Sequence, residues 1–204
     1  MAAPRAATDV DVTLAVSEAL ATHAAVRAVR LVGSRAAGEE HELSDWDFAV
    51  ETDDFAAVAA DLGGLVAPLG PISELWDPYS DYACYMLMLP GPVKVDLIFP
   101  AERWVWSPAW EATPATLAAI DHHFWDWALW LEQKRRQGRT SQLEKSMGDL
   151  YELLLRPLGA RTRPRSIAEA LSSYLQAREA LETRFGVRVP RDLEREVRPV
   201  LDRV

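Results

Sequence analysis

Cysteine is almost absent from this sequence, since Cys84 is the only one in 204 residues. A single cysteine excludes an internal disulfide framework and favours a reducing compartment, so the expected location is the cytoplasm. Cys84 lies in the apolar run YACYMLML, where a buried, unreactive thiol is the usual arrangement.

Long hydrophobic runs are also missing. No apolar stretch approaches the length of a membrane span, and the N-terminal segment MAAPRAATDVDV lacks the apolar core and cleavage pattern of a signal peptide. The sequence therefore predicts no association with a membrane.

Basic residues are outnumbered, with 22 Lys and Arg against 31 Asp and Glu, which gives a net charge of -9. A nucleic-acid-binding protein takes most of its affinity from Lys and Arg on phosphates, so this balance disfavours nucleic acid as a partner. It suits a protein that handles a cationic or metal-bound small molecule.

The sequence patterns divide the chain into two parts. Residues 1–100 predict an α/β (α+β) domain with a mixed β-sheet and flanking helices, because helical periodicity from Thr8 alternates with strand-like runs. The expected strands are 26–33, 46–50, 82–89 and 93–99, with a short helix at about 54–64. Residues 101–204 predict a C-terminal α-helical bundle, with helices at about 115–137, 140–156, 166–185 and 190–204.

The most informative segment is LVGSRAAGEEHELSDWDFAV. Asp45 and Asp47 alternate with Trp46 and Phe48, so in a strand the two acids share one face while the aromatics anchor the other in the core. Their backbones would lie about 6–7 Å apart. Carboxylates this close repel one another, and a hard cation between them would explain the pair.

The residues before this pair favour an anion. The strand that ends at Gly33 presents the backbone amides of Gly33 and Ser34 at the start of a short helix, and such amides are a natural seat for a phosphate. The hydroxyl of Ser34 and the charge of Arg35 add to this preference.

A third acid, Asp96, lies in the otherwise apolar strand VKVDLIF. A buried acid needs a partner or a metal ion, so Asp96 is either a third metal ligand or an edge-strand acid that reaches water. Lys94 shares its face of the strand and could equally be its neutralising partner.

A Gly-Ser pair, ten residues and then Asp-x-Asp, with a strand on each side, resembles the signature of the DNA polymerase β-like nucleotidyltransferase superfamily. The resemblance covers about 26–100. It implies an enzyme that uses two Mg²⁺ ions, held by Asp45, Asp47 and Asp96, to transfer a nucleotidyl group from ATP or another nucleoside triphosphate to a hydroxyl. Asp96 could also accept the hydroxyl proton. The residues expected at the nucleotide are Gly33, Ser34, Arg35 and Ser44.

The segment from about 115 to 156, with FWDW followed by LEKSMGDLYELLL, looks like the streptomycin-modifying aminoglycoside 6-adenylyltransferases. The likeness places Lys145 at the triphosphate and Asp149, His123 and Trp125 near the acceptor. Those enzymes are considerably longer and carry an acid where this chain has His123. Trp125, Trp127 and Trp130 on this helix, after Trp104, Trp106 and Trp110 in the linker, are either core residues or the lining of a cleft.

The leading hypothesis is therefore transfer of AMP, or another nucleotide, to a small, aminoglycoside-like acceptor with release of pyrophosphate, as in enzymes of antibiotic resistance. Two alternatives remain. The acceptor could be a protein or a tRNA end, as for the nucleotidyltransferases of toxin–antitoxin pairs, or the chain could be a non-catalytic nucleotide-binding subunit. Active sites in the superfamily can be shared between subunits, which allows a homodimer.

Overall fold

We describe the protein from a computed structural model, which covers residues 6–103 and 110–202. Trp104, Trp106 and the last two residues of the final expected helix lie outside the described residues. The chain divides into two units, Met1–Glu40 with Ser44–Trp106, and His41–Leu43 with Ser107–Val204. Each unit is described by itself.

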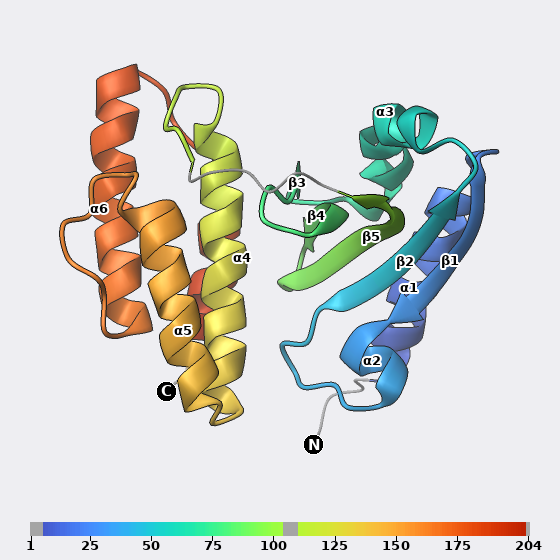
Figure 1. Ribbon diagram of the computed structural model, residues 1–204, viewed down its shortest axis with the longest axis horizontal. Coiled ribbons are helices and arrows are strands. Elements are labelled where there is room, and N and C mark those ends of the chain that lie inside the picture. The colour runs from blue at the N-terminus through green and yellow to red at the C-terminus, as the bar shows by residue number, and fades with distance from the viewer. Residues whose placement is uncertain (1–5, 104–109, 203–204) are drawn as a thin grey trace. The chain divides into compact units, whose positions relative to one another are not determined.

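The first unit is built on a five-stranded mixed sheet (Figure 1). Its spatial order is β1-β2-β5-β4-β3, and every neighbouring pair is antiparallel except β2 and β5, which are parallel. The strands are β1 (Val26–Val32), β2 (Trp46–Thr52), β3 (Ser73–Trp76), β4 (Tyr82–Leu89) and β5 (Val93–Arg103). The fold class expected from the sequence, a mixed α/β unit followed by helices, is confirmed.

One face of this sheet is apolar and forms the core. Trp46 and Phe48 are buried at alternate positions of β2, as predicted, and Val95 and Leu97 do the same on β5. The same alternation turns Asp47 and Asp96 to the opposite face. Because β2 and β5 are parallel neighbours, Asp47 lies directly beside Asp96 in register.

Helices of this unit complete its core. Val16 and Leu20 of α1 and Val58, Leu62 and Val66 of α3 are fully buried in it. Asp54 caps α3, since its side chain accepts a hydrogen bond from the amide of Ala57 at 3.0 Å. The helices are α1 (Ala6–Ala21), α2 (Gly33–Ala37), α3 (Phe55–Val66) and a short 3₁₀ turn (Ala67–Leu69).

The second unit is helical throughout its regular structure, and α4 contacts α5, α6 and α7 (Figure 1). The expected helix at 140–156 is present without a gap, with α5 continuing directly into a π-helical turn at Tyr151–Leu155. The bounds are α4 (Leu117–Arg136), α5 (Thr140–Leu150), α6 (Ile167–Phe185) and α7 (Asp192–Leu201). None of the described helices combines the length and apolar character needed to cross a bilayer.

A buried polar network lies within the core of the helical unit. The Oδ1 atom of Asp121 accepts hydrogen bonds from Tyr174 at 2.5 Å, from Arg178 at 3.0 Å and from the indole of Trp125 at 3.3 Å. Burial raises the pKa of Asp121, against the opposing effect of Tyr174 and Arg178. Phe124 stacks on the ring of Tyr174, with 3.8 Å between centroids. This network joins α4 to α6.

Candidate active site

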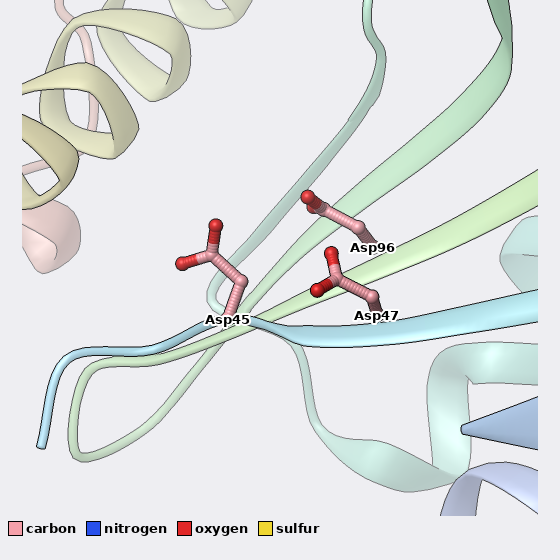
Figure 2. A group of neighbouring side chains, drawn as sticks. All are labelled: Asp45, Asp47 and Asp96. Carbon is pink, nitrogen blue, oxygen red and sulfur yellow. The ribbon is translucent and has the colours of Figure 1, made fainter. Parts of the chain in front are cut away.

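Three carboxylates converge on the face of the sheet opposite the core. Asp47 comes from β2, Asp96 from β5 and Asp45 from the residue before Trp46, and one oxygen of each lies within 4.8 Å of the others. Figure 2 shows the three side chains directed toward a common space. The expected strand, 46–50, and β2 both begin at Trp46, so Asp45 directly precedes the strand that carries Asp47.

The surroundings of Asp47 disfavour its ionised form. The pKa of Asp47 is raised from 3.8 to about 6, first by burial and then by the charge of Asp45, while Lys94 and Arg35 act in the opposite direction. A divalent cation among these oxygens would offset both effects by stabilising the ionised carboxylates. Oxygen ligands from several carboxylates are the donors that Mg²⁺ and similar hard ions take. The residues present thus fit a divalent metal site.

Lys94 is a buried cation beside this cluster. Its side chain is only 6 % exposed, and its Nζ atom lies 3.1 Å from Oδ1 of Asp45. The sequence left Asp96 open as a partner of Lys94, because the two share a face of one strand. The ion pair with Asp45 depends on the path of the chain before β2, which strand alternation does not predict.

Gly33 follows β1 and closely approaches the cluster. Its φ of +69° lies in the left-handed region, and a Cβ atom there would lie 2.2 Å from Oδ2 of Asp47. Only glycine meets both conditions without strain. The sequence predicted Gly33 and the half-buried Ser34 as phosphate-binding residues, but it did not reveal the contact with Asp47.

Arg35 holds the segment that carries Asp45. Its Nε atom donates to the carbonyl oxygens of Ser44 at 3.1 Å and Asp45 at 3.2 Å, and its Nη2 atom donates to Ser44 at 2.9 Å. The guanidinium also lies 4.0 Å from the centroid of the Trp46 ring. Ser44 itself is buried. The sequence pointed to a phosphate contact for Arg35 and did not indicate these bonds.

The residues expected at the acceptor lie in the helical unit, as does Lys145, which was expected at the triphosphate. Lys145 and Asp149 form an exposed pair one helical turn apart, with Nζ 2.9 Å from Oδ2. His123 is 5 % exposed and packs edge-on against Trp110 and Trp127. Trp125 is fully buried in the core, so a direct contact with an acceptor would require a rearrangement.

Comparisons with known proteins give low similarity. No family model matches the chain, and no curated protein matches it. Among solved structures, the chain is similar to the polymerase core of TRAMP, an RNA surveillance complex, with 10 % identity and a TM-score of 0.41 over 68 % of this chain and 44 % of the other. It is also similar to an aminoglycoside 6-adenyltransferase from Bacillus subtilis, with 9 % identity and a TM-score of 0.32; the match covers 89 % of this chain and 93 % of the other. Likeness at this level carries no weight for function, which must rest on the geometry of the site.

Proposed function

We propose that the protein is a divalent-metal-dependent nucleotidyltransferase. It transfers AMP, or another nucleoside monophosphate, from a nucleoside triphosphate to a hydroxyl of a small aminoglycoside-like acceptor and releases pyrophosphate. The observation that carries this proposal is the convergence of Asp45, Asp47 and Asp96 beside the left-handed Gly33.

Asp45, Asp47 and Asp96 would hold the metal, and two Mg²⁺ ions would use all three carboxylates. When bound, the ions supply positive charge to the triphosphate and acidify the acceptor hydroxyl. The raised pKa of Asp47, about 6, supports this assignment, because burial and the charge of Asp45 disfavour its ionised form and a bound cation would stabilise that form.

The reaction is an in-line displacement at the α-phosphorus. The acceptor oxygen forms a bond to that phosphorus, the bond to the bridging oxygen of the β-phosphate breaks, and pyrophosphate leaves. Asp96 would accept the hydroxyl proton. The amides of Gly33 and Ser34 and the Ser34 hydroxyl would bind the β- and γ-phosphates, and Arg35 and the buried Ser44 would keep Asp45 in place.

The acceptor is proposed from charge and from the helical unit. A net charge of -9 favours a cationic acceptor over a polyanion such as tRNA. His123 and Asp149 are the candidate acceptor residues, and Lys145 is the candidate contact to the triphosphate. The chemistry at Asp45, Asp47 and Asp96 does not depend on these three assignments.

The direct test is to incubate the protein with ATP, Mg²⁺ and a panel of aminoglycosides, and to measure pyrophosphate release and the mass added to each acceptor. Asp47→Asn and Asp96→Asn should each reduce turnover by at least about a hundredfold, because each would weaken the hold on the ions that stabilise transition-state charge. Asp53→Asn is the matched control, because Asp53 is an acid near the far end of the same strand in an exposed pair with Arg27.

Three results would contradict the proposal in different ways. Unchanged turnover in both variants would remove the carboxylates from the chemistry. AMP mass on a co-purifying protein, with none on the aminoglycosides, would change the acceptor. Calorimetric binding of ATP without turnover of any acceptor would make the chain a non-catalytic nucleotide-binding subunit.

A further inference from the structure

Lys94 is an unusual residue for its position. Neighbouring positions of β5 are apolar, and Lys94 is buried at 6 % exposure opposite the buried Met88 of β4. Lysine is almost never fully buried unless it is paired. Replacement of a buried ion pair by apolar residues is often neutral or stabilising, so stability alone gives no reason to keep an ammonium group here.

Lys94 interacts with the carboxylates of Asp45 and Asp47. Its Nζ atom lies 3.1 Å from Oδ1 of Asp45, and its charge also lowers the pKa of Asp47. Asp45 is more accessible than its partner, with 19 % of its side chain exposed. The three carboxylates are therefore partly exposed, whereas the ammonium-bearing side chain of Lys94 is buried beside them.

On the basis of the proposed function, we propose that Lys94 is a positioning residue for Asp45 and the resident counter-cation of the three carboxylates. In the ion-free protein its ammonium group offsets their repulsion and holds Asp45 against the strand. The same contact competes with a divalent ion for Asp45, so Lys94 sets the ion concentration at which the site fills. A merely structural lysine would not affect that concentration.

The ion-free protein provides the test without nucleotide or turnover. Mn²⁺ would be titrated into chelator-treated wild type, Lys94→Met and Lys94→Arg by calorimetry, and urea unfolding would be followed with and without the ion. Lys94→Met should bind Mn²⁺ at least about tenfold more tightly, since a nearby like charge and a competitor are both removed. In chelator, the urea midpoint of Lys94→Met should be lower than that of wild type. Addition of Mn²⁺ should raise the midpoint of Lys94→Met by more than it raises the midpoint of wild type. Lys94→Arg, which retains the charge, should bind no more tightly than wild type.

Arg30→Met is the matched control. Arg30 is a cation of the same sheet whose Nη2 atom lies 2.5 Å from the exposed Glu51, so its removal makes the same change in net charge away from the cluster. An equal gain in Mn²⁺ affinity in this variant would attribute the effect to overall charge and overturn the inference. Unchanged or weaker binding by Lys94→Met would also overturn it. If Lys94→Met does not fold without the ion, tighter binding by Lys94→Arg than by wild type would overturn it as well.

The outcomes separate this inference from the function on which it rests. If wild type binds Mn²⁺ and turns over substrate while Lys94→Met binds with the same affinity, the inference alone fails. If neither wild type nor Lys94→Met binds Mn²⁺ and no turnover occurs, both the inference and the proposed function fail.

Discussion

The two glycines at the ends of α2 share a backbone conformation but not their surroundings. Gly33 has φ +69° and Gly38 has φ +70°, yet a Cβ atom at Gly33 would meet Asp47 whereas one at Gly38 would meet nothing within 4 Å. Substitution by alanine at each position therefore separates backbone strain from crowding at the site.

We expect both Gly33→Ala and Gly38→Ala to lower the free energy of unfolding by about 1–2 kcal/mol, the cost of a left-handed non-glycine residue. Gly33→Ala should in addition weaken Mn²⁺ binding by about 10- to 100-fold, as displacement of a group that supports a metal ligand does. Urea denaturation and Mn²⁺ calorimetry on the two variants would check this. Equal Mn²⁺ affinities would show that the short approach to Asp47 has no effect on the site.

The raised pKa of Asp47 gives the ion-free protein a pH dependence of stability. As the pH rises above 3.8, the unfolded chain releases this proton first, while the native state keeps it to about pH 6. The unfolded state is therefore favoured progressively across this window, and the penalty remains at higher pH. Asp47→Asn removes the titrating group, so it should lose less stability than wild type between pH 4 and 6.

Urea denaturation in the presence of a chelator, at several pH values for both proteins, measures this difference directly. Acids remote from Asp47 titrate alike in both proteins and cancel in the comparison, whereas Asp45, whose charge interacts with Asp47, contributes to the difference. Parallel stability curves for wild type and Asp47→Asn would show that Asp47 titrates normally.

At the scale of elements, α4, α6 and α7 are tied together by Arg178. Its guanidinium is 5 % exposed and pairs with the buried Asp121 at 3.0 Å and with Glu194 at 2.5 Å. Arg178→Met would leave the charge of Asp121 buried without its cation, which costs about 3–5 kcal/mol in comparable cases. Arg198→Met removes a half-exposed partner of the same Glu194 and should cost less than about 1 kcal/mol.

The helical signal and the denaturant midpoint of these two variants would test the comparison. Similar small losses in both would mean that Tyr174 and Trp125 are sufficient to satisfy Asp121.

The sequence predicted four of the five strands, because their apolar runs are bounded by strong turn residues such as Pro90-Gly91-Pro92. It missed β3 (Ser73–Trp76), a strand of four residues at the edge of the sheet that is too short to show a period. The change from α- to π-helical hydrogen bonding at Tyr151–Leu155 was not predicted either, since the apolar pattern continues through it.

At the site, side-chain alternation in β2 predicted that Asp45 and Asp47 share a face, and the resemblance to the nucleotidyltransferase superfamily implied that Asp96 joins them. Side-chain alternation did not predict which groups hold the segment that precedes β2. The pairing of Lys94 with Asp45 and the bonds from Arg35 to the carbonyls of Ser44 and Asp45 depend on a tertiary path that no local pattern encodes.

At the scale of the whole molecule, the net charge of -9 should attract a cationic acceptor before it binds. For a cationic acceptor, KM should rise about threefold or more between about 0.05 and 0.5 M salt, because the Debye length shrinks over that range. An uncharged acceptor should show no such rise. Steady-state kinetics with one acceptor of each kind would check this, and equal salt sensitivity would indicate an effect on the nucleotide or metal instead.

The parallel contact between β2 and β5 also has a consequence for how the chain folds. These strands are adjacent in space, but α3, β3 and β4 all lie between them in the sequence. Their pairing closes a long loop, and such non-local pairing is slow compared with helix or hairpin formation. The carboxylates therefore meet only when β5 docks on β2, a step that their mutual repulsion opposes. A refolding experiment with Mn²⁺ present should thus detect ion uptake only at the end of folding, which makes the ion a reporter of the completed sheet.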